Sequence, residues 1–161
     1  MNLSLTKFIS IIYRQGQRYY DRELVHHGIG CGQQFLLLRI YENDGISMYD
    51  LAVLGHFDKG TVTKAVQKLE EEGYLRIETD PADRRVRRLH VTDKAEAVIQ
   101  TTYSVRSQWT DILTKGFTEE ELTMADRLLS RMAENAYQSM NGGDQLEHKC
   151  SRTNETKSTG I

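Results

Sequence analysis

The chain has 161 residues, of which 39% are hydrophobic and 27% charged, a mixture typical of a globular protein and unlike a disordered or fibrous one. The 21 basic and 23 acidic residues give a net charge of −2, which argues against indiscriminate nucleic-acid binding but permits a focused basic surface. Two cysteines are too few for a secreted disulfide framework, and the longest apolar run, residues 35–38, is far shorter than a membrane span, so we expect a cytoplasmic protein without membrane contact.

Helical periodicity dominates the first part of the chain. Apolar positions recur at helical spacing and predict a long helix over residues 3–25. A glycine-marked connection precedes a second helix over residues 33–42, which ends before Gly45. Ser47, followed three residues later by Asp50, predicts the start of a short third helix that ends at about residue 54, before a tight turn.

The fourth helix is expected to run from its N-cap, Asp58, to residue 72. It has one apolar stripe, formed by Val62, Val66 and Leu69. Packing of that stripe turns a basic and polar face outward, which consists of Lys59, Gly60, Thr61, Thr63, Lys64, Gln67 and Lys68. Such a face suits the major groove of DNA, because these side chains bond base edges or phosphates and a helix N-terminus attracts phosphate. The alternative is a solvated helix surface without a ligand.

After Gly73, which ends this helix, the period of the sequence changes to two. Alternating residues at 75–79 and 88–91 flank an Asp/Pro turn and predict a β-hairpin. We expect its tip to hold four arginines, namely Arg84, Arg85, Arg87 and Arg88. An arginine at such a tip fits a narrow minor groove, and Asp83 is interpreted as its orienting partner.

Two more helices are expected in the C-terminal part. Thr92 and Asp93 open a long fifth helix, which Gly116 ends, and residues 118–121 form a capping box for a sixth. Residues 142–161 are expected to be a disordered tail. The fold class expected is mainly α with a small β-hairpin, because two helices joined by a tight turn and followed by a basic hairpin make a winged helix-turn-helix.

These motifs resemble those of the MarR family of transcriptional regulators. Residues 83–92 are similar to the family's wing signature, Asp-x-Arg followed by Leu-x-Leu-Thr, with Val91 replacing the second leucine. Residues 58–75 look like its recognition helix and exit, with Gly60 where serine or alanine is common. The likeness extends over roughly residues 5–140.

The resemblance implies a sequence-specific DNA-binding regulator, usually a repressor, that a small aromatic, drug-like or oxidising effector releases from a pseudo-palindromic operator. It implies Arg85 as the minor-groove arginine and Asp83 as its partner. It also implies a homodimer in which a single domain, residues 1–141, contributes dimerisation helices at residues 1–30 and 93–141 beside a winged helix-turn-helix at residues 33–92. The dimer has independent support, because the flanking helices carry more apolar surface than a monomer of this size covers.

A second candidate site concerns the effector. An arginine beside aromatic side chains suits an aromatic or phenolic acid. The residues that could line such a pocket are Tyr13, Arg14, Arg18, Phe35 and Arg39. Their alternative role is that of core residues and surface ion pairs.

Other function classes have weaker signals. Cys31 is a candidate oxidant sensor, against the alternative of a small, partly buried thiol. The spacing of His26, His27, Cys31 and His56 matches no tight zinc pattern, so no metal is expected. Without a catalytic triad order, a phosphate-binding glycine loop or a His-Glu-x-x-His motif, we expect no enzyme and no cofactor. A protein-binding winged helix is a further hypothesis, which the basic tip disfavours.

Overall fold

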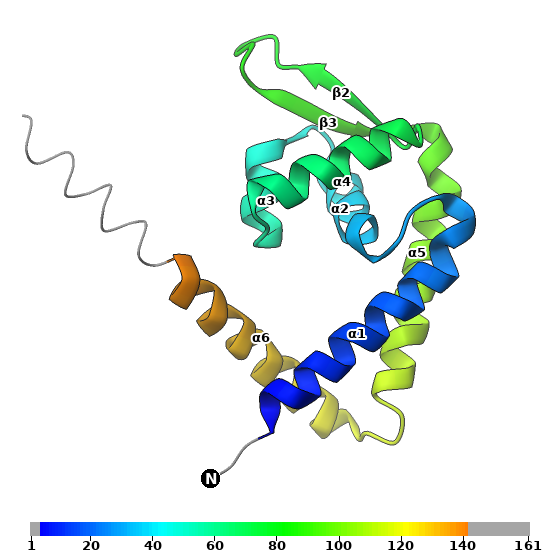
Figure 1. The fold of residues 1–161 in the computed structure, drawn as a ribbon, viewed down its shortest axis with the longest axis vertical. Helices are drawn as coiled ribbons and strands as arrows, with labels where there is room; N and C mark the ends of the chain where they lie inside the picture. Colours follow the sequence, from blue (N-terminus) through cyan, green and yellow to red (C-terminus); the bar gives the residue numbers. More distant parts are fainter. Residues whose placement is uncertain (1–3, 142–161) are drawn as a thin grey trace, which may run out of the picture. The chain divides into compact units, whose positions relative to one another are not determined.

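The computed structural model describes residues 4–141, and the chain divides into two compact units, Met1–Leu113 and Thr114–Ile161. The first unit holds most of the secondary structure (Figure 1). Its elements in chain order are α1 (Leu5–Leu24), the 3-10 helix η1 (Val25–His27), α2 (Cys31–Glu42), β1 (Ile46–Ser47), α3 (Met48–Gly55), α4 (Lys59–Glu71), β2 (Leu75–Thr79), β3 (Arg87–Val91), the 3-10 helix η2 (Asp93–Ala95) and α5 (Glu96–Leu113). The expected fold class, mainly α with a small β-hairpin in a winged helix-turn-helix, is confirmed, and the hairpin belongs to a three-stranded antiparallel sheet.

Local side-chain caps define the helix-turn-helix formed by α3 and α4. Ser47 accepts a hydrogen bond from the Asp50 N–H at 3.0 Å, and Asp58 accepts one from the Thr61 N–H at 2.9 Å, so free N–H groups at both helix starts are satisfied. Between the helices, the left-handed backbone of His56 (φ 54°) makes the turn. The expected capped helices and the tight turn between them are therefore confirmed.

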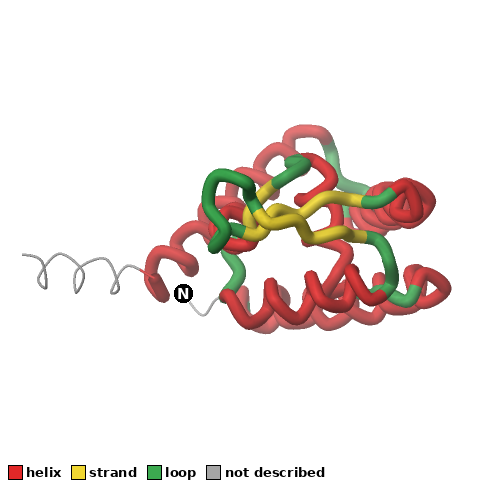
Figure 2. The backbone as a smooth tube through the Cα atoms, turned by 90° about the horizontal axis from the view of Figure 1, so that it is seen from above, coloured by secondary structure: helices red, strands yellow, loops and turns green. Residues whose placement is uncertain are grey.

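The sheet has a third strand that the sequence did not predict. β3 is its central strand and pairs antiparallel with both β2 and β1 (Figure 2). Leu89 is the partner of Ile77 on one side and of Ile46 on the other. β1 has only two residues, too few to produce an alternating pattern. Through this pairing, the β2–β3 hairpin, which is the wing, is bonded to the segment between α2 and α3.

The start of the fifth helix differs from the expectation. Thr92 and Asp93 do not open α5 directly, because the 3-10 helix η2 comes first. The Thr92 hydroxyl donates to the Gly73 carbonyl at 2.7 Å instead of capping a helix. The connection after the wing is thereby fixed to the end of α4, which is a tertiary contact that local sequence does not predict.

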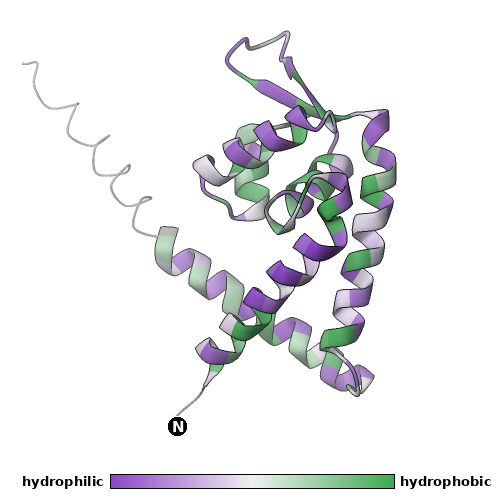
Figure 3. Cartoon of the chain, turned by 45° about the vertical axis from the view of Figure 1, so that its right-hand side comes forward, coloured by the Kyte–Doolittle hydropathy of each residue, from purple (hydrophilic) through white to green (hydrophobic). Residues whose placement is uncertain are grey.

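The core of the first unit lies between α2, α4, the sheet and the start of α5. Its most completely buried side chains are Leu24, Leu36, Leu37, Leu38, Ile40, Leu51, Val62, Val66, Leu69, Leu89 and Ile99. The N-terminal part of α1 differs, since Leu5, Phe8, Ile9 and Ile12 are all exposed. This part of α1 carries the apolar surface without a partner in the monomer, where green residues are visible in Figure 3.

The second unit contains α6 (Glu119–Asn141). The expected capping box is present, because the Thr118 N–H donates to Glu121 at 2.8 Å and the Glu121 N–H donates back to the Thr118 hydroxyl at 3.2 Å. The tail expected at residues 142–161 lies outside the described residues. None of the helices between residues 4 and 141 is long and apolar enough to cross a membrane.

Candidate nucleic-acid interface

α4 is an amphipathic helix with one buried and one exposed face. The buried face consists of Val62, Ala65, Val66 and Leu69. The opposite face contains most of the basic and polar residues that were expected to meet DNA, which are Lys59, Gly60, Thr61, Lys64 and Gln67. Thr63 and Lys68 are half-buried and lie at the margins of this face.

The side chains of this set are not equally available to a ligand. Thr61 donates to the Asp58 carboxylate at 2.5 Å, and Thr63 donates to the Lys59 carbonyl at 2.8 Å. Lys68 forms an ion pair with Glu72 at 2.5 Å. Among the described residues, the side chains of Lys59, Lys64 and Gln67 have no such partner. These three are therefore the side chains of this face that no intramolecular hydrogen bond or ion pair holds in the described structure.

The start of α4 is capped by a carboxylate of its own chain. Hydrogen bonds from the Thr61 hydroxyl and from the Thr61 N–H hold the pKa of Asp58 below its usual value. Gly60 is exposed, and the nearest atom to a Cβ built there is Asp58 Oδ1 at 3.2 Å. The absence of a side chain at Gly60 permits close approach to the backbone of the first turn, but the Thr61 N–H is already bonded to Asp58.

The tip of the hairpin holds fewer arginines than expected. Arg84 and Arg85 lie between the strands, but Arg87 and Arg88 are part of β3, so their expected place at the tip is wrong. Arg87 donates to the Thr79 hydroxyl across the sheet at 3.2 Å. The strands continue through these two residues because Arg87 pairs in register with Thr79 and Arg88 with Glu78.

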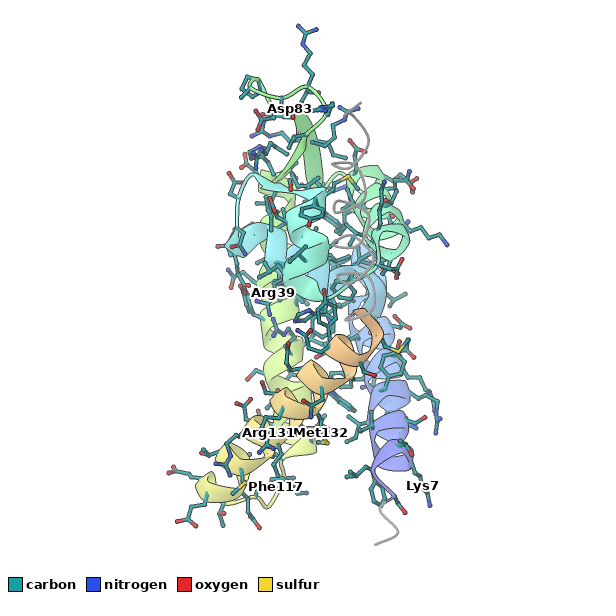
Figure 4. The ribbon with its side chains drawn as sticks, turned by 90° about the vertical axis from the view of Figure 1, so that its left-hand side faces the viewer. Lys7, Arg39, Asp83, Phe117, Arg131 and Met132 are labelled. Carbon is teal, nitrogen blue, oxygen red and sulfur yellow. The ribbon has the colours of Figure 1, made fainter. Side chains whose placement is uncertain are left out.

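Asp83 and Arg85 form a fork-shaped pair at the end of the hairpin, where Figure 4 labels Asp83. Arg85 donates from Nε to Asp83 Oδ1 and from Nη2 to Oδ2, both at 3.1 Å. These bonds, together with one from the Arg85 N–H, lower the pKa of Asp83. The Arg85 side chain is nevertheless 91% exposed. The pair holds a guanidinium in a defined direction while leaving it accessible.

Asp80 and Arg88 are structural residues of the site whose roles the sequence analysis missed. Asp80 accepts hydrogen bonds from the Ala82 N–H at 2.7 Å and from Arg88 Nε at 2.8 Å. These two bonds lower the pKa of Asp80, the one from Ala82 most. An aspartate directly before Pro81 is a typical turn-forming signal, which would have indicated the first contact. The second contact depends on strand register.

The expected effector residues separate into two groups. On α1, Arg14 binds Ser10 at 2.6 Å, Tyr13 accepts from Gln17 at 3.0 Å, and Arg18 is exposed. On α2, Arg39 pairs with Glu42 at 2.8 Å. Both Arg14 and Arg39 thus bond within their own helices.

Phe35 has an arginine neighbour that the sequence did not suggest. The Arg106 guanidinium of α5 lies over the Phe35 ring, 5.7 Å from its centroid, and the Tyr20 ring lies 6.3 Å away. Next to Phe35 in α2, Gln34 is fully buried, and neither its amide oxygen nor its amide nitrogen has a hydrogen-bond partner in the described structure. A buried amide without partners costs free energy. Phe35, Tyr20 and Arg106 thus bring two rings and a guanidinium together where α1, α2 and α5 meet.

Cys31 does not have the surroundings of a reactive thiol. Burial, and to a lesser extent the Asp21 carboxylate, raise its pKa, whereas reactive cysteines need a lowered one. Asp21 accepts from the Cys31 N–H at 2.8 Å and so caps α2. His26, His27, Cys31 and His56 form no metal-binding group in the part of the chain that the structure describes.

Comparisons with known proteins agree with this geometry. The model of the MarR family matches residues 32–86. The HTH-type transcriptional regulator YybA of Bacillus subtilis (strain 168) is 33% identical over 104 residues, which are 65% of this chain and 69% of YybA. A crystal structure of MarR matches with a TM-score of 0.71 and 36% identity over 83% of this chain and 98% of that one. A MarR transcriptional regulator from Methanosarcina mazei Go1 matches with a TM-score of 0.75 and 36% identity over 82% and 95%.

Proposed function

The chain belongs to the MarR family of DNA-binding transcriptional regulators, and from this we propose that it is a homodimeric repressor that leaves a pseudo-palindromic operator when a small aromatic effector binds. The observation that carries the proposal is the exposed Arg85, oriented by Asp83 at the end of a hairpin. A second basic element, the open face of α4, belongs to the same unit. Together they offer two contacts to one duplex.

In this proposal α4 enters the major groove. Lys64 and Gln67 are one turn apart on the exposed face, so both can reach base edges or phosphates. Lys59 lies at the helix N-terminus and binds a phosphate through its ammonium group, and Gly60 lets the backbone approach the DNA closely because it has no side chain. Thr61, Thr63 and Lys68 act mainly by holding this helix in shape, as their present hydrogen bonds and ion pair support.

The hairpin supplies the second contact. Arg85 enters the adjacent minor groove, whose narrow A·T-rich form attracts guanidinium groups. Arg84 and Arg87 lie on either side of it in the chain and bind flanking phosphates. Each good base contact contributes about 1–3 kcal/mol, so one winged unit is too weak alone, and two units at half-sites roughly 34–36 Å apart give useful affinity.

The dimer is supported by apolar surface outside the winged part. Phe8 is 56% exposed and Ile12 is 44% exposed on α1, and Leu129 is 52% exposed on α6. Several large apolar side chains exposed on one helix are typical of a protein interface, and each of these two helices has them. We propose that a single domain, residues 1–141, uses residues 1–30 and 93–141 for dimerisation and residues 33–92 as the winged helix-turn-helix.

The effector site that we propose consists of Phe35, Arg106 and Tyr20. The guanidinium would pair with a carboxylate or phenolate, and the rings would pack against the effector's ring. A ligand that favours one arrangement of the dimer by about 1–3 kcal/mol changes operator occupancy severalfold or more.

The DNA part is tested by selecting genomic fragments with the full-length protein and measuring their affinity by fluorescence anisotropy. We expect a palindromic motif, and weaker binding for Arg85→Ala with unchanged folding by circular dichroism. An absence of salt-sensitive binding to any fragment would contradict the proposal. It would instead favour a protein-binding winged helix.

The effector part is tested by calorimetry with a panel of benzoates and phenols. Arg106→Ala should abolish binding, and Arg14→Ala serves as the matched control because Arg14 bonds only to Ser10 on its own helix. Equal loss with both variants would point to the α1 group instead. No binding of the panel to the wild-type protein would remove aromatic acids from the proposal.

A further inference from the structure

Arg88 is half-buried, and its guanidinium is bonded to two groups of the protein itself. Its Nε atom donates to Asp80 Oδ2 at 2.8 Å, and its Nη2 atom forms an ion pair with the same oxygen at 2.7 Å. Its Nη1 atom donates to the Gly45 carbonyl at 3.2 Å. With 39% of the side chain exposed and its donors directed at these two partners, Arg88 joins the end of β2 to the turn before β1.

Asp80 links Arg88 to the backbone of the hairpin tip, residues 80–86. While Oδ2 binds Arg88, Oδ1 accepts from the Ala82 N–H at 2.7 Å and from the Asp83 N–H at 3.3 Å. The Asp80 side chain is only 14% exposed, so water competes little for these bonds. The position of the Asp83 backbone therefore depends on a carboxylate that Arg88 holds from the other side.

Asp83 in turn orients Arg85 through its own carboxylate. A continuous series of polar contacts thus runs from the Gly45 carbonyl through Arg88, Asp80 and Asp83 to the exposed guanidinium. We infer that Arg88 is a positioning residue for operator binding: it fixes the hairpin tip relative to the helix-turn-helix and so presents Arg85 to the DNA.

Backbone contacts fix the base of the hairpin, since β1 pairs with β3 and the Gly45 N–H donates to the Leu89 carbonyl at 2.9 Å, but they leave the position of the tip less defined. The strand ladder ends at the pair Thr79 and Arg87. Beyond it, the Asp80 N–H donates to the Val86 carbonyl at 2.9 Å, which closes the neck of the loop. Neither of these last two contacts connects the tip, residues 80–86, to the turn at Gly45. A binding group that is held loosely by its surroundings loses affinity because its freedom must be removed on binding.

This inference rests on the proposed function, because it requires a duplex that Arg85 contacts. The test is a double-mutant cycle in the full-length protein with a fluorescent duplex selected from a randomised library by the wild-type protein. The variants are Arg88→Ala, Arg85→Ala and the two combined. Arg76→Ala is the matched control, since it also removes one cation from the sheet, but Arg76 pairs with Glu78 at the surface.

We expect Arg88→Ala and Arg85→Ala each to weaken binding on the order of tenfold. In the Arg85→Ala background, the further change of Arg88→Ala should stay below about twofold, because the two residues act through one contact. Arg76→Ala should leave affinity within about twofold of the wild type. A role confined to stability would not produce this dependence on Arg85.

Two results would overturn the inference while leaving the proposed function intact. One is wild-type affinity for Arg88→Ala when Arg85→Ala binds weakly, and the other is an additive, roughly hundredfold loss in the double variant. If Arg88→Ala does not fold, Asp80→Asn takes its place in the cycle with the same expected pattern. Failure of the wild-type protein to select any duplex would overturn the proposed function and the inference together.

Discussion

Asp83 holds Arg85 through both of its carboxylate oxygens, yet leaves 91% of the arginine side chain exposed. In this geometry, Asp83 orients the guanidinium, and the exposed Arg85 side chain is left to contact a ligand. We expect Arg85→Ala to weaken operator binding on the order of tenfold or more, because it removes the groove contact. Asp83→Asn should cause a loss of affinity severalfold smaller than that of Arg85→Ala. The guanidinium remains, but the amide no longer accepts hydrogen bonds from both Nε and Nη2. Anisotropy titrations at one salt concentration compare the two, and equal losses would mean that Asp83 has a role of its own at the DNA.

The ion pairs of Asp83 and Asp80 predict how the stability of the hairpin changes at low pH. Bonds from Arg85 lower the pKa of Asp83, and bonds from Ala82 and then Arg88 lower that of Asp80. A carboxyl group with a lowered pKa in the folded state stabilises the fold above its unfolded value, about 4, and loses this contribution as the pH falls through the folded value.

The hairpin tip should therefore remain ordered down to about pH 4 and become disordered only below the lowered values. Carbon-detected NMR titration of the two carboxyl groups measures this directly. Asp83→Asn should remove the transition assigned to the pair with Arg85. A titration of Asp83 at or above the usual aspartate value would contradict the observed bonding.

The elements that the sequence predicted well are those defined by neighbouring residues. Ser47, Asp58 and Thr118 each accept a hydrogen bond from the backbone N–H of the residue three positions later. Such caps can be predicted from residue type and spacing. Gly73 ends α4 with φ +75° for the same local reason. The position of the apolar stripe predicts most of the outward face of α4, but Thr63 and Lys68, expected on that face, are half-buried at its margins.

The features that the sequence did not predict depend on contacts between distant segments. Arg88 and Gly45 are 43 residues apart, and nothing near Arg88 indicates that it lies in a strand facing that carbonyl. Arg106 meets Phe35 only because α5 crosses α2. The burial of Gln34 is similarly a tertiary effect, since a glutamine in an amphipathic helix is usually exposed. Function-bearing contacts of this kind follow from packing and not from periodicity.

The connection between α1 and α2 requires glycine at position 28. It has φ +69°, and a Cβ built there lies 2.7 Å from Glu72 Oε2, while Glu72 is already paired with Lys68 at the end of α4. We expect Gly28→Ala to destabilise the protein by roughly 1–3 kcal/mol, from backbone strain and from displacement of that carboxylate. Gly32→Ala is the control, because nothing lies within 4 Å of its added Cβ. Urea unfolding should show no loss for the control, and equal stability of both variants would refute the requirement.

If the exposed apolar face of α1 is the dimer interface, a charge introduced into it should weaken dimerisation. Phe8→Glu should raise the dimer dissociation constant more than 100-fold, since an unpaired carboxylate at an apolar interface costs roughly 3 kcal/mol or more. Tyr49→Glu is the matched control, because Tyr49 is 77% exposed on α3, in the part assigned to DNA. Sedimentation equilibrium measures both variants. A Phe8→Glu protein that remains as tightly dimeric as the wild type would show that this face is not the interface.

Salt dependence tests how many cations meet the DNA backbone. If the dimer neutralises about 8 phosphates, the slope of log affinity against log salt should be near −7. Lys64→Ala removes one contact per subunit, so the slope should become less steep by about 2 for the dimer. Lys115→Ala, a change in the exposed loop before α6, should leave the slope unchanged. A wild-type slope near zero would exclude the duplex as partner, and a slope that Lys64→Ala does not alter would place Lys64 at a base edge instead of a phosphate.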